Sequence, residues 1–174
     1  MDDRLDENVI RACQKGDKAA YAVLVKTYYK DVFAQCLGML GNIHDAEDAT
    51  QEAMLKGLLR IGELHKPDLF ESWILQIARN LCIDFLRRQK RMRTSGVKES
   101  SRSGLQASDD DTLQRAISRL PQELRVPLTM FYFDGKNAKK IAEKLNISHS
   151  GACKRIRQAR QQLHELLTER TYDE

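Results

Sequence analysis

The sequence has few of the residues that interrupt helices, since its 174 residues include only three prolines and nine glycines. Runs that alternate apolar and polar residues, the usual sign of half-buried strands, are also scarce. The mean hydropathy is −0.55, and no apolar run approaches the ~20 residues that a membrane span requires. No signal-peptide pattern precedes Asp2. We therefore expect an all-α, highly soluble, cytoplasmic protein without membrane insertion.

Metal-binding and catalytic signatures are also missing. The four cysteines are scattered without a Cys-x-x-Cys pair, and the four histidines are equally dispersed. The one dense group, His44 to Asp48, lies within a predicted helix, where adjacent residues point in different directions and do not share a metal. No nucleophile, base and metal set can be named. We expect no zinc site, no cofactor and no enzymatic activity, with the cysteines reduced and mostly in the core.

Charge is distributed unevenly along the chain although the formal net charge is only +4. Acidic residues gather at 2–7, 45–52 and 109–111, and basic residues gather at 87–93 and 136–160. Such asymmetry is typical of a protein with one surface for nucleic acid and another for a protein partner.

Helical periodicity divides the chain into two parts. Apolar residues recur at helical spacing from about residue 5 to residue 92, and again from Thr112 onward. The segment between them, 94–111, is polar, serine-rich and without period, which indicates a flexible linker. The sequence therefore predicts two small helical domains, 1–93 and 112–174, joined by residues 94–111.

The second predicted domain contains two helices joined by a short turn. Asn137 can cap the first helix and Ser148 the second, with only residues 146–148 between the two helices. Between Lys136 and Arg160 there are eight lysines and arginines and one carboxylate, Glu143. This pattern favours a helix-turn-helix that enters a DNA major groove. A solvated helical hairpin with a basic surface is the alternative.

The predicted helix from Asp45 to Ile61 combines a small apolar face with an opposite face of mixed character. That second face carries Asp48, Gln51 and Glu52 together with Leu55 and Leu59. Leucines flanked by carboxylates suit a helix that packs onto a basic partner helix. The alternative is that both leucines pack within their own domain.

The predicted helix from Phe70 to about Met92 becomes basic toward its end, with five basic residues in 87–93. Basic residues at a helix C-terminus often only complement the helix dipole or form a solvated face. Five exceed what that role needs, which favours a contact with nucleic acid.

Three motifs together resemble one protein family. Residues 45–52, Asp-Ala-Glu-Asp-Ala-Thr-Gln-Glu, are similar to the region 2 signature of bacterial sigma factors, Asp-Ala-Glu-Asp-x-x-Gln-Glu. Residues 70–88 resemble regions 2.3 and 2.4, and residues 145–148 with 154–160 resemble the end of region 4. The chain thus resembles the extracytoplasmic-function (ECF) group of the sigma-70 superfamily, with regions 2 and 4. It departs from the family at Lys139 and Lys140, where glutamates are usual, and at Cys153, which replaces a usual lysine.

The resemblance implies roles for three residue sets and identifies partners. Residues expected to bind core RNA polymerase are Asp45, Asp48, Gln51, Glu52, Leu55 and Leu59. Residues expected at the minus-10 element are His65, Lys66, Arg79, Asn80, Arg87, Arg88 and Lys90, and the loop 62–69 would capture an unpaired base. Residues expected at the minus-35 element are Lys139, Lys140, His149, Ser150, Gly151, Lys154, Arg155, Arg157 and Gln158. The implied partners are the polymerase β′ clamp helices and β flap, promoter DNA and an anti-sigma factor.

The resemblance therefore predicts a bacterial transcription initiation factor that directs core polymerase to specific promoters and helps to open the minus-10 region. A freestanding helix-turn-helix regulator, which binds palindromic operators as a dimer, is the alternative. That alternative explains only the C-terminal part of the chain and gives no role to the predicted helix from Asp45 to Ile61, with its leucines and carboxylates.

Overall fold

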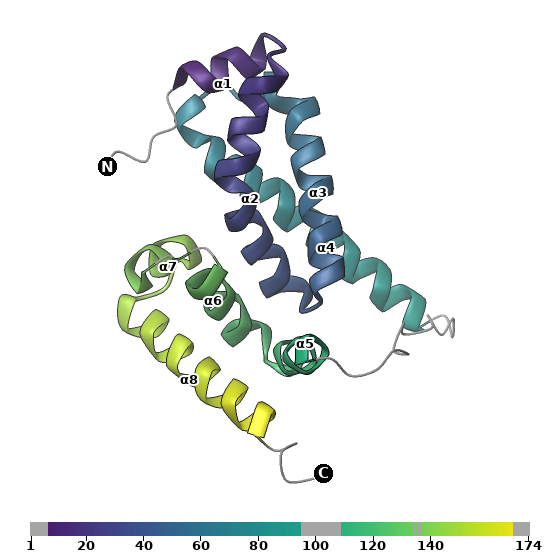
Figure 1. Ribbon diagram of the computed structural model, residues 1–174, viewed down its shortest axis with the longest axis vertical. Helices are drawn as coiled ribbons and strands as arrows, with labels where there is room; N and C mark the ends of the chain where they lie inside the picture. Colours follow the sequence, from purple (N-terminus) through teal and green to yellow (C-terminus); the bar gives the residue numbers. More distant parts are fainter. Residues whose placement is uncertain (1–6, 95–108, 134, 136, 169–174) are drawn as a thin grey trace.

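The computed structural model describes residues 7–94, 109–133, 135 and 137–168. Over these residues the chain forms helices joined by turns, which confirms the predicted all-α class (Figure 1). The α-helices are α1 (Glu7–Gln14), α2 (Lys18–Leu40), α3 (Ile43–Arg60), α4 (Phe70–Thr94), α5 (Asp109–Arg119), α6 (Gln122–Phe133), α7 (Ala138–Leu145) and α8 (His149–Thr168). Two short 3-10 helices, η1 (Ile61–Glu63) and η2 (Pro67–Leu69), lie between α3 and α4. Among the described helices, none combines the length and apolar character needed to cross a bilayer.

The predicted linker, 94–111, is helical at both ends. Helix α4 continues to Thr94, whose hydroxyl donates a hydrogen bond to the Lys90 carbonyl oxygen, 2.9 Å away. Helix α5 begins at Asp109, three residues earlier than the sequence predicted. Acidic residues are favoured in the first turn of a helix, a signal to which the prediction gave too little weight. The rest of the predicted linker, 95–108, lies outside the described residues.

Local capping explains where α2 and α3 begin and end. The Asp17 carboxylate accepts hydrogen bonds from the backbone N–H groups of Ala19 and Ala20, at 2.8 and 3.1 Å. At the other end of α2, Gly41 takes a left-handed conformation with φ of 73°, and its N–H donates to the Leu37 carbonyl. Asn42 then caps α3 by accepting from the Asp45 N–H at 3.0 Å. The Gly-Asn pair therefore turns the chain sharply from one helix into the next.

The first half of the chain packs α1 to α4 around one apolar core. Fully buried side chains from α2 and α4 form its centre, including Leu24, Leu37, Phe70 and Ile74. Small residues on α3 let this helix lie close to the others. A Cβ at Gly57 would lie only 2.6 Å from Ile74 Cδ1, so a larger residue there would push α3 outward.

The second half packs α5 to α8 around two smaller apolar clusters. One joins α6, α7 and α8 through Met130, Ile141 and Ile156. The other joins α5, α6 and α8 through Leu120, Leu124 and Ala159. Helix α6 also lies beside α2, so the two halves of the chain contact each other (Figure 1).

Candidate protein-binding and nucleic-acid-binding sites

Helix α3 presents two leucines to solvent. The side chains of Leu55 and Leu59 are 57% and 75% exposed, while Ala46, Ala53 and Met54 on the opposite face are buried. The alternative in which both leucines pack within their own domain is therefore wrong. The two leucines thus form an exposed apolar patch on one face of α3, as the sequence predicted for a surface that binds a protein partner.

Polar residues surround these leucines as the sequence predicted. Asp48, Gln51 and Glu52 are exposed on α3, and Asp45 in the first turn is half-buried. Glu52 forms an ion pair with Lys56, one turn further along, at 2.9 Å. An exposed pair of this kind contributes little to stability and can exchange its partner at low free-energy cost. The six predicted polymerase-binding residues thus all lie on α3, with Asp45 the least accessible.

The loop between α3 and α4 is fixed by a residue that the sequence analysis did not single out. The Gln14 side-chain amide donates hydrogen bonds to the carbonyl oxygens of Ile61 and Leu64, at 3.2 and 2.7 Å. The Leu64 side chain is buried, whereas the next two residues, His65 and Lys66, are exposed. The Gln14 side chain therefore ties α1 to the backbone of the loop, and the loop presents the polar side chains of His65 and Lys66 at the surface.

A surface hollow lies where this loop meets the first turns of α4. It is lined by Glu63, Leu64, His65, Lys66, Leu69, Ser72, Trp73 and Gln76. The hollow thus combines an aromatic side chain, hydrogen-bonding groups and a lysine. Stacking and hydrogen bonding are the interactions by which proteins hold an unstacked base. Of its lining, the sequence predicted His65 and Lys66 as site residues, and Glu63, Leu64 and Leu69 also belong to the loop 62–69 that was expected to capture a base. Trp73, at the edge of the apolar stripe of α4, was the feature of the sequence that could have identified the α4 part of the lining.

The middle of α4 continues the exposed polar face. Arg79 and Asn80 are both exposed, and the Gln76 amide donates to Asn80 Oδ1 at 2.9 Å. This hydrogen bond joins the hollow to the next turn of the helix. The polar groups of α4 therefore form a continuous strip from the loop toward the basic end.

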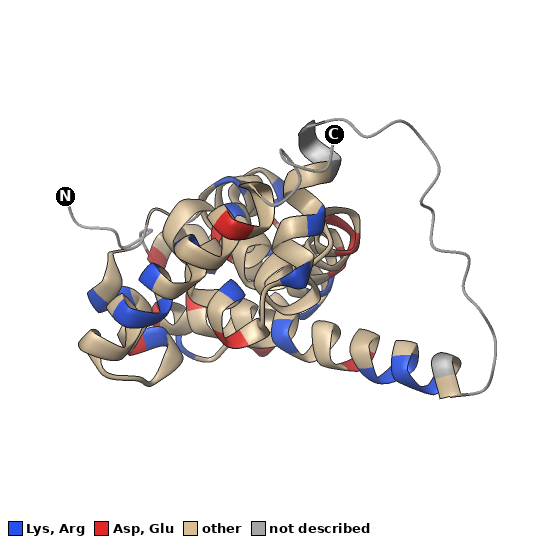
Figure 2. Ribbon diagram, turned by 90° about the horizontal axis from the view of Figure 1, so that it is seen from below, with Lys and Arg blue, Asp and Glu red and all other residues tan. Residues whose placement is uncertain are grey.

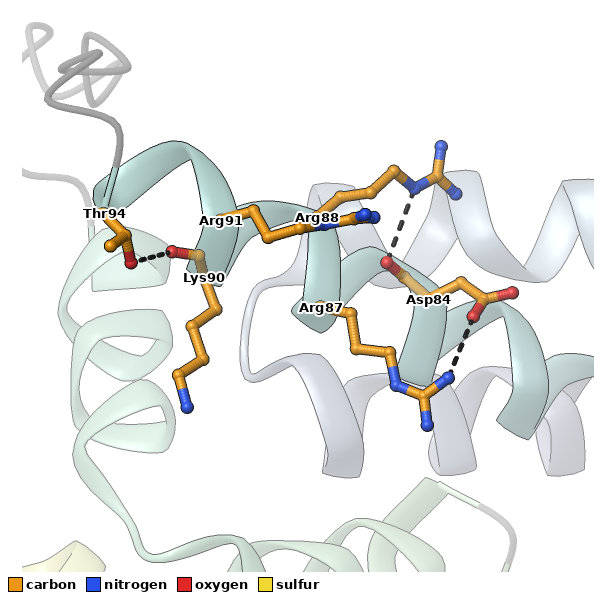
Figure 3. A pocket seen from close by; sticks show the side chains of 6 residues that line it. All are labelled: Asp84, Arg87, Arg88, Lys90, Arg91 and Thr94. Atoms are coloured by element: carbon orange, nitrogen blue, oxygen red, sulfur yellow. Dashed lines mark hydrogen bonds and ion pairs between the residues drawn. The ribbon is translucent and has the colours of Figure 1, made fainter.

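The C-terminal end of α4 projects from the body of the protein and is strongly basic (Figure 2). Arg87 and Lys90 extend from one side of the helix, and Arg88 extends from the other (Figure 3). Asp84 has arginines both three and four residues further along α4, and its carboxylate pairs with Arg87 at 3.7 Å. Arg88 Nε instead donates to the Asp84 carbonyl at 3.4 Å. Residues three apart share a helix face as well as residues four apart, so the spacing alone did not decide the partner.

The helix-turn-helix is formed by α7, a three-residue turn and α8, with both predicted caps. The Asn137 side chain accepts from the Lys140 N–H at 3.0 Å, and the Ser148 hydroxyl accepts from the Gly151 N–H at 3.0 Å. Asn146 adopts the left-handed conformation, φ 52°, which ends α7 and reverses the chain. The two helices are held by Ile141, Ala142, Ala152 and Ile156, so the opposite side of α8 is free of core contacts.

Most of the predicted DNA-contacting residues of this motif are exposed. They are Lys139, Lys140, His149, Ser150, Lys154, Arg157 and Gln158. Gly151 and Arg155 are half-buried. A Cβ at Gly151 would lie 3.0 Å from Ser148 Oγ, so this glycine makes room for the helix cap. At 100° per residue, Arg155 lies to one side of the strip that contains Lys154 and Arg157.

Thiols and metal-ligating groups show no assembled centre in the described residues. Cys13, Cys36 and Cys82 are buried, and Cys153 is exposed on α8. The contact between the buried Cys36 and Cys82 raises the pKa of the Cys82 thiol, which burial raises further. In the part of the chain described, no three histidine, cysteine or carboxylate side chains lie close enough to hold a metal ion.

Comparisons with known proteins identify the family. Residues 24–92 match the family model of Sigma-70 region 2, and residues 110–163 match that of Sigma-70, region 4. The chain is 31% identical over 176 residues to the ECF RNA polymerase sigma factor SigW of Bacillus subtilis, covering 91% of this chain and 94% of SigW. It is 30% identical to the ECF RNA polymerase sigma factor SigE of Mycolicibacterium smegmatis, covering 87% of this chain and 64% of SigE. The chain therefore belongs to the ECF RNA polymerase sigma factors.

A solved structure shows the same fold. The sigma factor RpoE, in complex with the anti-sigma factor NepR from Bartonella quintana, superposes with a TM-score of 0.64 at 19% identity. The superposition covers 85% of this chain and 96% of RpoE. Sigma factors are transcription initiation factors rather than enzymes, which agrees with the expectation drawn from the sequence.

Proposed function

We propose that this chain binds core RNA polymerase through α3, directs it to promoters and assists opening of the minus-10 region in the bacterial cytoplasm. The observation that carries the proposal is the exposure of Leu55 and Leu59 beside Glu52 on α3. Leucines provide apolar area, and the surrounding carboxylates favour a basic partner and fix its register. The β′ clamp helices are the partner that the family resemblance implies for this face.

The minus-10 element is proposed to lie along α4. The hollow lined by His65, Lys66 and Trp73 offers a place for one unpaired base. Stacking of that base on the Trp73 ring would offset part of the stacking energy that the base loses when it leaves the duplex. Arg79 and Asn80 continue the strip, and Arg87 and Lys90 extend it toward the backbone phosphates. Arg88, on the other side of the helix, belongs to this contact only if the DNA wraps around the end of α4.

The minus-35 element is proposed to bind α7 and α8. The exposed strip on α8 begins at its N-terminal end, where recognition helices contact base edges. Ser150 and Lys154 are therefore assigned to bases, and Arg157 together with Lys139 and Lys140 of α7 to phosphates. Arg155, half-buried and to one side, has the geometry of a phosphate contact.

Two further partners are proposed from the family. The second half of the chain would contact the polymerase β flap, and an anti-sigma factor would hold the chain inactive. The structural similarity to RpoE, solved with its anti-sigma factor NepR, supports the second of these. Co-purification of the chain with a separately expressed candidate anti-sigma factor, and loss of polymerase binding in that complex, would test it.

The freestanding dimeric regulator is the competing function. It makes the opposite prediction for the isolated protein, because a dimer binds palindromic DNA without polymerase. The test is to measure binding to promoter and palindromic DNA fragments, with and without core polymerase. We expect a monomer that binds promoter DNA specifically only with core polymerase. Tight binding of a dimer to a palindrome without polymerase would overturn the proposal.

A further inference from the structure

The hollow between the loop 62–69 and α4 has one wall that the core holds and one wall that it holds less directly. On the α4 side, the half-buried Trp73 ring packs against the buried Phe70 ring, with the ring centroids 5.9 Å apart. On the loop side, the lining belongs to η1, η2 and the short connection between them. Helices of the 3-10 type have poor hydrogen-bond geometry and are marginal in such short pieces. The loop wall therefore depends on contacts with other parts of the chain.

Side chains from two helices hold the loop backbone at its two ends. At the C-terminal end, the Ser72 hydroxyl of α4 donates to the Leu69 carbonyl oxygen at 2.9 Å. At the N-terminal end, the Gln14 amide of α1 donates to the carbonyl oxygens of Ile61 and Leu64, at 3.2 and 2.7 Å. The Ser72 contact spans three residues of the chain, whereas the Gln14 contacts span 47 and 50. Gln14 therefore fixes the loop relative to a distant helix, which Ser72 does not do.

The chemistry of these two bonds determines where the tip of the loop lies. A primary amide nitrogen has two N–H donors, and Gln14 uses them on two acceptors. The Leu64 carbonyl belongs to the rigid peptide plane that joins Leu64 to His65. A bond of 2.7 Å to this oxygen orients that plane, and the buried Leu64 side chain fixes the same residue from its other side. Gln14 thus sets the direction in which His65 leaves the backbone, toward or away from the hollow.

Gln14 is itself positioned by the core rather than by the loop. It is the last residue of α1, and Ile10 and Cys13 of this helix are buried in the core formed with α2 and α4. Directly after it, the Gly16 N–H donates to the Cys13 carbonyl at 2.9 Å, and Gly16 takes the left-handed conformation with φ of 94°. The end of α1 is therefore fixed before the loop is considered, and Gln14 passes that position on to the loop.

We propose that Gln14 is a positioning residue for capture of the unpaired minus-10 base, because it holds the loop where the base can stack on Trp73 while it contacts His65 and Lys66. This inference rests on the proposed function, since it takes the hollow as the site of that base. A site that is ordered before binding avoids the cost of ordering it when the ligand arrives. The Gln14 amide should therefore increase the affinity for the base itself, with little effect on phosphate contacts elsewhere on α4.

Gln14→Met removes both N–H donors while it keeps a flexible side chain of similar length. The first half of the chain should stay folded, because Ile10 and Cys13 still anchor α1 in the core. The Ile61 carbonyl also keeps a second donor, the Leu64 N–H at 3.2 Å. Gln14→Glu is an independent variant that keeps the shape of the side chain and places a carboxylate, which has no N–H, against the two carbonyls.

Arg11→Met is the matched control, three residues earlier on α1. The Arg11 side chain is exposed and forms an ion pair with Glu7 at 3.3 Å, away from the loop. Circular dichroism and the melting temperature establish that each variant is folded. The probe is single-stranded DNA that carries the minus-10 element of a promoter transcribed with the chain, and each position of the element is made abasic in turn. Binding is measured to the complex of the full chain with core polymerase.

The deciding quantity is the ratio of the dissociation constants for abasic and intact DNA at each position. For the native chain we expect one position at which loss of the base weakens binding by about tenfold, the effect of stacking one base on an aromatic ring. Both Gln14 variants should lower that ratio to about twofold and leave the other positions unchanged, since only the base contact depends on the loop. Arg11→Met should leave all ratios unchanged, because a general loss of affinity cancels in a ratio.

Hydrogen exchange of the free chain gives a second measurement that does not depend on DNA. Exchange over residues 61–66 should be faster in both Gln14 variants, with no change over α3. An unchanged ratio in folded Gln14 variants, a loss of affinity by one factor for every DNA, or unchanged exchange in the loop would overturn the role of Gln14. If the native chain shows no position that depends on its base, the proposed base capture fails and this inference fails with it. A base-dependent position that persists in the Gln14 variants would instead overturn the role of Gln14 alone.

Discussion

The hydroxyl group of Tyr21 donates a hydrogen bond to the carbonyl oxygen of Met54, 2.5 Å away, and so joins α2 to α3. The Tyr21 side chain is 6% exposed, and burial raises its pKa to about 12. Gly57 lies next to this contact, since a Cβ there would be 2.7 Å from the tyrosine oxygen. The helix that carries the candidate polymerase-binding face is therefore positioned by one buried hydroxyl and one glycine.

Tyr21→Phe should lower the free energy of unfolding by about 1 kcal/mol near neutral pH, because the Met54 carbonyl loses its side-chain donor. The pH dependence should also change. The pKa of Tyr21 is raised in the folded state, so the unfolded chain releases this proton first. The contribution of Tyr21 to the free energy of unfolding is therefore fully present below about pH 10, the ordinary pKa of tyrosine. It is lost as the pH rises from 10 to about 12.

Urea denaturation at pH 8, 10 and 11 measures this effect, with Tyr132→Phe, at an exposed position of α6, as the control. The difference in stability between native chain and Tyr21→Phe should shrink as the pH rises above 10. A difference that stays constant over this range would show that Tyr21 ionises as it does in the unfolded chain.

Much of the fold was predictable because helix signals in this sequence are local. Asn137 and Ser148 were recognised as caps from residue types and spacing alone. Caps depend on hydrogen bonds within one turn, so no tertiary information is needed. The start of α5 at Asp109 was missed because a serine-rich, aperiodic segment precedes it.

The contacts between distant segments were not predictable in the same way. Arg125 has the sequence appearance of an exposed residue on an amphipathic helix, yet two of its three backbone acceptors, Gly38 and Met39, lie 87 and 86 residues earlier in the chain. Gln14 fixes the loop before α4 from 47 and 50 residues away. Periodicity identifies which face of a helix is buried, but it does not identify the helix that covers it.

The candidate polymerase-binding face was predicted from a pattern that periodicity does resolve. Two leucines amid carboxylates on one side of α3 indicated either a partner or an internal contact, and the exposure of both leucines favours a partner. The sequence assigned Arg88 to the same DNA contact as Arg87 and Lys90. In the structure Arg88 extends from the other side of α4, a difference that residue spacing did not reveal.

Leu55→Ala and Leu59→Ala should each weaken binding to core polymerase by about tenfold, the effect of removing an apolar anchor worth 1–2 kcal/mol. The melting temperature should stay the same, because neither side chain is buried in the free chain. Val23→Ala is a suitable control: Val23 is 45% exposed but lies on α2, outside the α3 face. Fluorescence anisotropy of labelled chain titrated with core polymerase gives the affinities. Equal affinities for all variants would remove α3 from the interface.

Lys154→Ala and Lys139→Ala should affect minus-35 binding differently. Lys154 is exposed on the strip of α8 assigned to bases, so its loss should relax preference at one or two positions, by about 1–3 kcal/mol for each base contact. Lys139 is exposed in the first turn of α7, and its loss should weaken all sequences alike and lower the salt slope by roughly one unit.

Competition binding of a promoter library to the polymerase complex, at two salt concentrations, separates the two roles. The native chain and Lys26→Ala, an exposed lysine on α2, provide the references. If Lys154→Ala weakens every library member by one factor, Lys154 contacts phosphate and the assignment of roles on α8 is wrong.

Run-off transcription tests the central claim most directly. Core polymerase is incubated with and without the chain on a DNA library with randomised minus-10 and minus-35 elements, and the transcripts are sequenced. We expect transcripts that depend on the chain, start at defined sites and share two upstream sequence elements, and we expect Leu55→Ala to reduce their yield. Transcription equal to that of core polymerase alone across the whole library would contradict the assignment of this chain as a promoter-directing sigma factor.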